Sequence, residues 1–269
     1  MATTRSTGSR KPLSRLTSAA AAVVLTASLA LSACSSDSGS DGKDVVFTTI
    51  DGNKGISPGA PMNPYNTKGN MFAGYNTQQL AYTKMNYTDI NDFYPALAES
   101  WEWSKDLKTV TIKIHPKAGW SNGDPVTAKD VVTSYAASIV AGTSAGINLG
   151  SAEAVGDKEV KLTQAEGTVT RTFLMNVLQT VVIRDAEYGP LLPKDIWTTI
   201  ADSQSEDEAK SKTATEAIAK LTPKITSHAP KTDVAAGPFS IVNINPGEAN
   251  LKKNEHFWAK DKIGPTKVV

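Results

Sequence analysis

Two stretches of the chain alternate apolar and polar residues with the period of a half-buried β-strand. Their apolar positions are Val110, Ile112 and Ile114 in the first stretch, and Val160 and Leu162 in the second. Successive side chains of a strand point to opposite faces of a sheet, so each pattern places one face in the core and the other in water. We therefore predict strands over residues 110–114 and 159–163.

A helix is predicted between these two strands. Thr127-Ala128-Lys129-Asp130 forms a capping box, in which the Thr and Asp side chains can bond free N–H groups of a first helical turn. Apolar residues then recur at helical spacing, and Gly142 stands where the helix can end. The apolar stripe consists of Val131, Val132, Tyr135, Ala136 and Ile139. Just before the capping box, Asn122-Gly123 predicts a tight hairpin, because both residues tolerate positive φ.

The rest of the chain adds shorter signals of both kinds. Residues 173–181 carry apolar side chains at helical spacing, and Ser205-Glu206-Asp207-Glu208 is a second capping box, which opens a polar helix through about Leu221. Strands are predicted over residues 45–50 and in the alternating segment 239–242. Mixed strands and helices without a regular βα repeat indicate an α/β or α+β fold.

The N-terminus has the arrangement of an export signal. Four basic residues precede an apolar stretch from Leu16 to Leu31, which falls short of the ~20 residues that a transmembrane helix needs. The stretch ends in Leu31-Ser32-Ala33-Cys34, which contains the only cysteine of the chain and resembles the bacterial lipobox. The basic residues are Arg5, Arg10, Lys11 and Arg15.

The lipobox resemblance implies a signal peptide over residues 1–33 and a mature N-terminus at Cys34, whose thiol carries diacylglycerol. Two acyl chains suffice for stable anchoring, since burial contributes roughly 0.8 kcal/mol per CH₂. Residues 34–44 would be the lipid anchor and a flexible tether, because 35–44 contain no apolar residue. We therefore expect the protein on the outer face of the cytoplasmic membrane.

Charge argues against a nucleic-acid partner. Without residues 1–33 the chain has 24 Lys and Arg against 27 Asp and Glu. Binding to a phosphate backbone needs a basic stripe, and a mildly acidic chain does not supply one. The remaining residues, about 235, are enough for one large domain or two modest ones.

The most specific motifs lie between residues 95 and 132. They are Pro95-Ala96-Leu97-Ala98-Glu99-Ser100-Trp101-Glu102-Trp103-Ser104, Lys108-Thr109-Val110-Thr111-Ile112 and Gly119-Trp120-Ser121-Asn122-Gly123-Asp124-Pro125-Val126 with the capping box that follows. Shorter motifs are Leu192-Pro193-Lys194, Gly237-Pro238-Phe239 and Asn254-x-x-Phe257-Trp258. This order of strand, hairpin and capped helix resembles the extracellular solute-binding proteins of family 5, which serve peptide, nickel and oligopeptide ABC importers.

The family resemblance covers residues 45–269 and implies a lobe of the type II periplasmic-binding-protein-like fold, of α/β (α+β) class. It implies a base subdomain over 45–64 and 171–269, with a smaller subdomain over 65–170 inserted in it. Family members are much longer and hold their ligand between two lobes. We therefore expect the first lobe only, with the second lobe missing, and leave open whether the chain is a truncation, half of a split gene or a functional short form.

The resemblance also implies ligand contacts and partners. In relatives the loop after Asn63-Pro64 lines the cleft, and its contacts fall on Lys68, Gly69 and Asn70. The loop over 143–150 also faces the cleft, and Asn148 lies near a position where some relatives use an aromatic ring. The implied partners are a peptide or other small ligand and an ABC permease, with no cofactor and no metal. Peptide, nickel chelate and oligosaccharide stay open as ligands, because most discriminating residues of relatives lie in the second lobe.

One motif supports an enzyme as the alternative. Gly142-Thr143-Ser144-Ala145-Gly146 matches the G-x-S-x-G nucleophile elbow, which would make the protein an exported serine hydrolase with Ser144 as nucleophile. The elbow needs a strand before the serine and a helix after it, whereas here the predicted helix comes first. We therefore expect no enzyme, and keep a non-binding remnant of a longer receptor as a further alternative.

Six other residues have a structural interpretation beside a functional one. Three tryptophans could be sugar platforms, but their place beside predicted strands favours core packing. Three histidines lack metal-ligand spacing and are expected at the surface or at strand ends. These residues are Trp101, Trp103, Trp120, His115, His228 and His256.

The lipobox interpretation predicts that Cys34→Ser abolishes lipidation, because no other cysteine is present to carry the lipid. Metabolic labelling with a fatty-acid probe measures this directly, and Ser36→Ala in the tether is the control that keeps the label. Unchanged labelling of Cys34→Ser would show that the protein is not a lipoprotein of this type.

Overall fold

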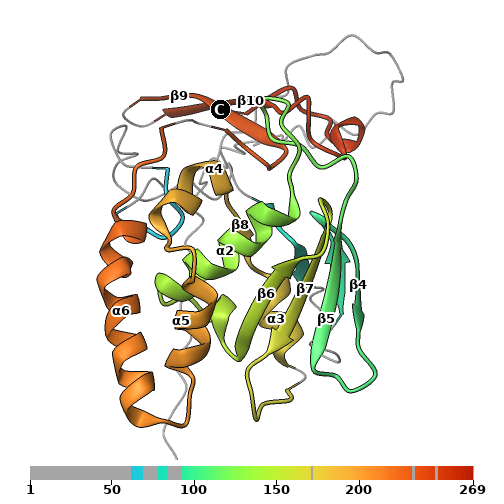
Figure 1. Ribbon diagram of the computed structural model, residues 1–269. Coiled ribbons are helices and arrows are strands. Elements are labelled where there is room, and N and C mark those ends of the chain that lie inside the picture. The colour runs from blue at the N-terminus through green and yellow to red at the C-terminus, as the bar shows by residue number, and fades with distance from the viewer. Residues whose placement is uncertain are drawn as a thin grey trace, which may run out of the picture. The chain divides into compact units, whose positions relative to one another are not determined.

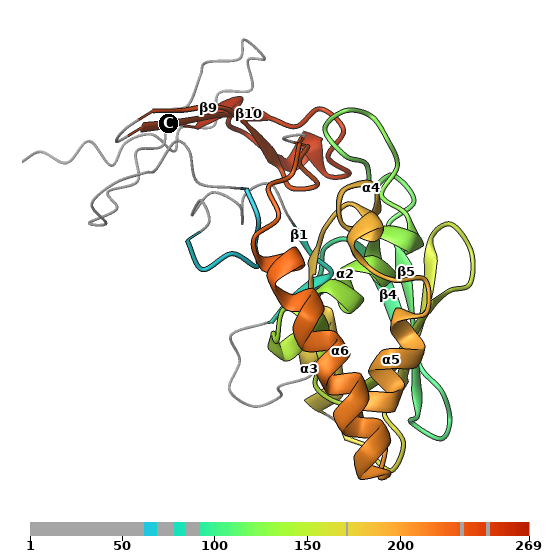
Figure 2. The same ribbon diagram turned by 60° about the vertical axis from the view of Figure 1, so that its left-hand side comes forward.

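The computed structural model describes residues 62–68, 78–83, 92–170, 172–231, 234–245 and 248–268 (Figures 1 and 2). The predicted strand over 45–50 and the lipobox lie outside the described residues. The strands are β1 (Gln78–Gln79), β2 (Ala81–Thr83), β3 (Phe93–Pro95), β4 (Ala98–Trp103), β5 (Thr109–Ile114), β6 (Leu149–Ala154), β7 (Glu159–Gln164), β8 (Val181–Val182), β9 (Phe239–Asn245), β10 (Glu248–Lys253) and β11 (Lys267–Val268). The helices are α2 (Ala128–Val140), α3 (Thr172–Leu178), α4 (Asp185–Tyr188), α5 (Ile196–Ser203) and α6 (Glu208–Thr226), with short 3₁₀ turns η1 (Ser144–Gly146), η2 (Gly189–Leu191) and η3 (Lys260–Lys262).

The largest sheet has four antiparallel strands in the order β4-β5-β7-β6. The predicted alternation is confirmed in its two central strands: every predicted apolar position of β5 and β7 is buried, whereas Lys113 between them in β5 is exposed. The register pairs Val110 with Leu162 and Ile112 with Val160. These cross-strand pairs make one continuous apolar face, on which a helix can pack.

Helix α2 lies between this sheet and the helices α5 and α6 (Figures 1 and 2). On one side, Val131 and Tyr135 join the core cluster of the sheet. On the other side, Ala137 packs in a second cluster with Ile200 of α5 and Ile225 of α6. Because both of its sides are covered, α2 is the element that the two cores share.

The predicted capping box at the start of α2 is confirmed. Thr127 is the N-cap residue, and the Asp130 carboxylate accepts a hydrogen bond from the Thr127 N–H at 2.7 Å. The same carboxylate accepts the Asp185 N–H at 2.8 Å, which ties α4 to the beginning of α2. The helix ends at Val140, and Gly142 follows with φ +75°, as predicted.

Three details differ from the sequence predictions. Helix α3 ends at Leu178, because Val181 continues as β8 and pairs with β1. Helix α6 begins at Glu208 instead of after Ser205, since the side chain of Asp207 is the one that caps the helix, and it runs past Leu221 to Thr226. In β9, Val242 is 56% exposed, so the apolar alternation there does not mark a fully buried face.

The predicted hairpin at Asn122-Gly123 is a tight turn rather than a pair of strands. One bridge, Gly119 to Pro125, closes it, and of the two central residues only Gly123 has a positive φ, +94°. The Asn122 side chain accepts the Asp124 N–H at 3.1 Å, so the turn is stabilised locally without strands on either side.

The family motif Asn254-x-x-Phe257-Trp258 fixes the end of the β9-β10-β11 sheet. The buried Asn254 side chain donates to the carbonyls of Ala235 at 3.3 Å and Gly237 at 2.9 Å, and accepts the His256 N–H at 2.9 Å. Phe257 is buried. One amide therefore satisfies the backbone of two chain segments, a role for which only Asn or Gln carries both donors and an acceptor.

Asn63 performs the same task for helix α6 and for the loop that follows Asn63. Its buried side chain donates to the Ile225 carbonyl at 2.7 Å and to the His228 carbonyl at 2.9 Å, and accepts the Tyr65 N–H at 2.9 Å. Carbonyls at a helix C-terminus have no partner within the helix, so this side chain completes the end of α6.

Asn63→Ala should destabilise the fold by about 1–3 kcal/mol, because it leaves buried carbonyls without donors. Urea denaturation followed by circular dichroism measures the change. Asn245→Ala, at an exposed position of β9, is the matched control and should stay within about 0.5 kcal/mol of the parent protein. Equal stabilities for the two variants would contradict the assigned role of Asn63.

Candidate functional site

A cavity of about 500 Å³ lies where three parts of the chain meet, and we call it the loop cavity. They are the loop after Asn63, the segment from the end of α2 to η1, and the segment from α3 to β8 together with β1. The lining residues are Pro64, Tyr65, Gln79, Ser138, Thr143, Ser144, Met175, Asn176, Gln179, Thr180 and Val181.

Tyr65 joins the first two parts of the wall. Its hydroxyl shares a hydrogen bond with Ser138 Oγ at 3.1 Å and donates to the Ser134 carbonyl at 3.3 Å. Its ring meets that of Tyr188 edge to face, with centroids 6.0 Å apart. Burial raises the pKa of the Tyr65 hydroxyl well above its usual value, and the Ser138 hydrogen bond offsets only part of that rise. The side chain is therefore neutral at every physiological pH.

The opposite wall carries three primary amides. The apolar residues of α3 are buried in the sheet core, so Asn176, and Gln179 just after the helix, are left facing the cavity. Gln79 lies beside them, because β1 pairs with β8 in the register that sets Gln79 opposite Val181. Within the described part of the chain, the side chains of Gln79, Asn176 and Gln179 have no hydrogen-bond partner, and each offers both donors and an acceptor to a ligand.

The structure brings together the two loops that the family resemblance places at the ligand cleft, but not every residue in them. Pro64 and Tyr65 represent the first loop in the cavity wall, and Thr143 and Ser144 the second. Lys68 is exposed, and its N–H donates to the Asn66 side chain at 2.8 Å. Gly69 and Asn70 lie outside the described residues.

Asn148 is half-buried just before β6 and does not line the loop cavity. It has a positive φ of 61°, a conformation that Asn tolerates better than most residues. Its carbonyl accepts the Ala165 N–H at 2.8 Å. The described contacts of Asn148 are thus backbone contacts at the start of β6, and none of them points to a ligand.

Sequence analysis missed the three amides. Asn176 lies on the side of the short helix α3 away from its apolar stripe, and Gln179 follows three residues later, just after the helix; this i, i+3 spacing was the available signal. No sequence pattern marked Gln79, because its position at the cavity depends on the pairing of β1 with β8, which lie about a hundred residues apart in the sequence.

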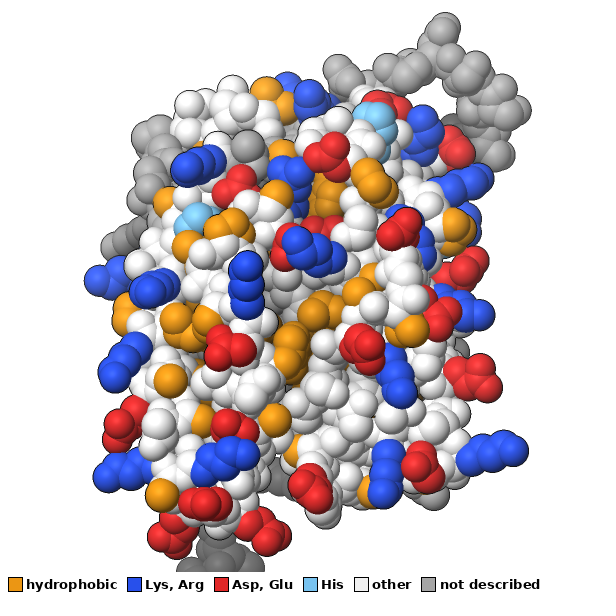
Figure 3. Space-filling model, viewed as in Figure 1, with side chains coloured by type: hydrophobic (Ala, Val, Ile, Leu, Met, Phe, Trp, Pro, Cys, Tyr) orange, Lys and Arg blue, Asp and Glu red, His pale blue; other side chains and the backbone are white. Residues whose placement is uncertain are grey.

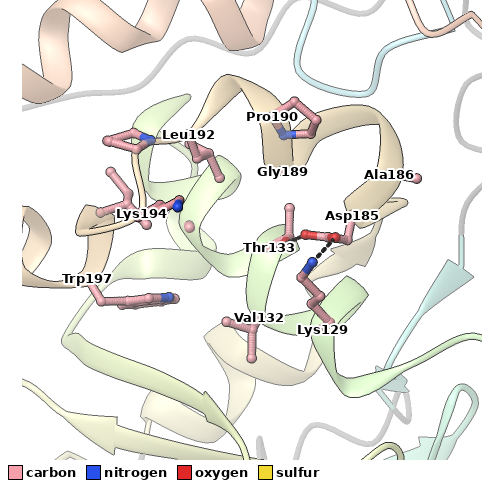
Figure 4. A pocket seen from close by; sticks show the side chains of 13 residues that line it. Lys129, Val132, Thr133, Asp185, Ala186, Gly189, Pro190, Leu192, Lys194 and Trp197 are labelled. Carbon is pink, nitrogen blue, oxygen red and sulfur yellow. Dashed lines mark hydrogen bonds and ion pairs between the residues drawn. The ribbon is translucent and has the colours of Figure 1, made fainter.

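A second pocket, of about 380 Å³, lies between α2, α4 and α5 (Figure 4). Two of its charged groups form an ion pair, in which Asp185 accepts from Lys129 Nζ at 2.8 Å, and Asp185 also accepts from Thr133 Oγ1 at 2.6 Å. Trp197 and Leu192 supply apolar wall. Because its carboxylate is already satisfied, this pocket is explained as a junction between helices, and the loop cavity is the better candidate for a ligand.

The predicted packing role of the three tryptophans is confirmed. Trp120 is 2% exposed, and Trp101 and Trp103 are partly buried against the same core. Trp101 meets Phe93 edge to face at 6.1 Å, and Trp103 contacts Phe173 at 6.0 Å between ring centroids.

The three histidines lie apart. His115 stacks on Trp258 at 4.6 Å, and burial lowers its pKa. His228 lies 3.7 Å from a Glu187 carboxylate oxygen, and His256 is exposed. Among the described residues there is no group of three or more His, Cys, Asp and Glu that could hold a metal ion.

Charged side chains of both signs are interspersed on the face shown in Figure 3. No helix within the described ranges combines the length and the apolar character that crossing a bilayer requires.

The environment of Ser144 differs from a nucleophile elbow. Helix α2 precedes the serine, which lies in η1, and strand β6 follows, so the order of strand, turn and helix is reversed. Neither a histidine nor a carboxylate is among the described residues that line the cavity with it.

Comparison with known proteins identifies the family. Residues 92–269 match the sequence model of the bacterial extracellular solute-binding proteins, family 5 (middle region), and the chain belongs to this family. The peptidoglycan-binding protein YepA of Agrobacterium fabrum is 28% identical over 176 residues, which are 64% of this chain and 23% of YepA. The dipeptide-binding protein DppE of Bacillus subtilis is 61% identical over 36 residues, 13% of this chain and 7% of DppE.

The fold is that of type II periplasmic binding proteins, as predicted. The substrate-binding domain of an oligopeptide ABC transporter from Bacillus anthracis superposes with a TM-score of 0.53 at 19% identity, over 83% of this chain and 40% of that chain. The chain thus spans less than a quarter of YepA and DppE and two fifths of the solved domain.

Ser144 should be chemically inert, since it does not lie on a nucleophile elbow and no described residue that lines the cavity with it is a histidine or a carboxylate. We expect a fluorophosphonate probe to leave the native protein unmodified, as judged by intact mass, under conditions in which a known serine hydrolase is labelled fully. Stoichiometric labelling that Ser144→Ala removes would instead assign the protein to the hydrolases.

Proposed function

We propose that this chain is a solute-binding component of an ABC importer for oligopeptides, that it is not an enzyme, and that the loop cavity is part of its ligand site. The observation that carries the proposal is the meeting of three primary amides, Gln79, Asn176 and Gln179, at one cavity, where their side chains have no hydrogen-bond partner among the described residues. A peptide main chain presents N–H and C=O groups at every residue, and side-chain amides pair with both.

Two further facts support a peptide as the ligand. The cavity draws its wall from the loops that the family resemblance places at the ligand cleft. DppE and the solved Bacillus anthracis protein are named for dipeptide and oligopeptide. Contacts to main-chain groups suit broad specificity, because every peptide offers the same donors and acceptors.

The rest of the proposal concerns the whole importer. The chain would be held on the outer face of the cytoplasmic membrane by lipid on Cys34, with residues 35–44 as tether, and would deliver ligand to the ABC permease. It would correspond to one lobe, with a base subdomain over 45–64 and 171–269 and an inserted subdomain over 65–170. Closure of two lobes over a shared ligand, driven by the higher affinity of the closed state, is the mechanism that the family resemblance implies.

One lobe alone should bind peptide weakly. We expect trialanine to bind residues 35–269 with a Kd in the millimolar range, because each tenfold step in affinity takes about 1.4 kcal/mol and one lobe supplies only part of the contacts. Titration followed by ¹H–¹⁵N NMR should shift the side-chain amide signals of Gln79, Asn176 and Gln179.

Asn176→Ala should weaken this binding several-fold, and Asn245→Ala, which removes an exposed amide outside the cavity, should leave it unchanged. Absence of any shift at saturating trialanine would favour the alternative of a non-binding remnant. Submicromolar binding would show that the chain is a receptor by itself.

A further inference from the structure

We infer that the loop cavity selects uncharged peptide segments and excludes Asp, Glu, Lys and Arg side chains. The inference rests on the proposed function and specifies the ligand class of the same site. Its basis is the composition of the wall: none of the eleven described lining residues carries a charge.

The ionisable side chain in the described wall, Tyr65, is also neutral. Among the described lining residues, Tyr65 is the one that can titrate, and burial raises the pKa of its hydroxyl well above the usual value. Its hydroxyl also donates to the Ser134 carbonyl and shares a hydrogen bond with the Ser138 hydroxyl. The described part of the wall therefore stays uncharged at neutral pH.

A charged ligand group that enters such a cavity loses water without gaining a counter-charge. Burial of an uncompensated ion is costly, whereas a neutral amide or hydroxyl recovers its hydrogen bonds from the wall. Gln79, Asn176 and Gln179 provide donors and acceptors in equal measure, so they favour groups that need both. Asn, Gln, Ser, Thr and the peptide group itself fit this description.

The second pocket differs from the loop cavity in the charge of its lining residues. It carries two lysines and an aspartate, Lys129, Lys194 and Asp185, although it is the smaller of the two. Between these two hollows, the loop cavity is the one whose described lining residues carry no charge.

The test uses three blocked peptides that differ only at the central side chain: N-acetyl-Ala-X-Ala-amide with X as Gln, Glu or Lys. Blocking both ends removes the terminal charges, and Gln and Glu are nearly isosteric. Titrations of residues 35–269 at pH 7, followed by the cavity amide signals, should give roughly tenfold weaker binding for the Glu and Lys peptides than for the Gln peptide.

A charge introduced into the wall should change this order. Asn176→Asp places a carboxylate in the cavity, so the Lys peptide should bind more tightly than the Gln peptide and the Glu peptide should become the weakest of the three. Asn245→Asp carries the same charge at an exposed site on β9 and should keep the parent order. Circular dichroism melts confirm that both variants are folded.

The outcomes separate the inference from the proposed function. If all three peptides shift the cavity amides with equal affinity, the cavity binds peptide but does not select by charge, and only the inference is wrong. If no peptide shifts these signals, the proposed function and the inference both fail. Tighter binding of the Glu or Lys peptide by the parent protein would also overturn the inference.

Discussion

The carboxylate of Asp130 holds the arrangement on which the rest of the structure depends. It accepts the Thr127 N–H at the start of α2 and the Asp185 N–H at the start of α4, and it is only 6% exposed. Two orphan donors at helix N-termini are thereby satisfied by one side chain, and the negative charge lies where helix dipoles favour it. The hydrogen bond from Thr127 fixes the residue at which α2 begins. It thereby sets which residues of α2 face the sheet and which face α5 and α6.

The two-sided burial of α2 links this bond to the loop cavity. A helix packed against a sheet on one side and against α5 and α6 on the other can be displaced only by repacking both cores. Ser134 and Ser138, one turn apart on α2, are both buried and bond the Tyr65 hydroxyl. A helix held by two cores thus positions a loop residue of the candidate site, and sites supported by helices and strands have more precise geometry than sites on loops alone.

Two buried asparagines, like Asp130, each bond several backbone groups with one side chain. Asn63 completes the C-terminus of α6 and begins the loop that carries Tyr65, and Asn254 ties the end of β10 to the segment before β9. Each side chain bonds backbone groups that are distant in sequence, so substitution leaves several buried groups unpaired at once. This explains physically why a family motif such as Asn254-x-x-Phe257-Trp258 is built around an amide, with Phe257 beside it in the core.

Local patterns determined the elements whose stability is local. The alternation in β5 and β7, the Thr127–Asp130 capping box and the stop at Gly142 follow from periodicity and from hydrogen bonds within a few residues, and all are confirmed. Patterns failed where neighbours in space decide. Val181 continues the apolar spacing of α3, yet it becomes a strand because β1 offers it a partner.

The candidate site was determined in part by sequence and in part by tertiary structure. The family motifs pointed to the loops at 63–70 and 143–150, and segments of both line the cavity. The three amides came from the fold alone, because Gln79 reaches Asn176 and Gln179 through the pairing of strands a hundred residues apart. The sequence sets which side chains are available. Long-range strand pairing and the burial of α2 decide which of them line the same cavity, because these contacts join residues that are distant in the sequence.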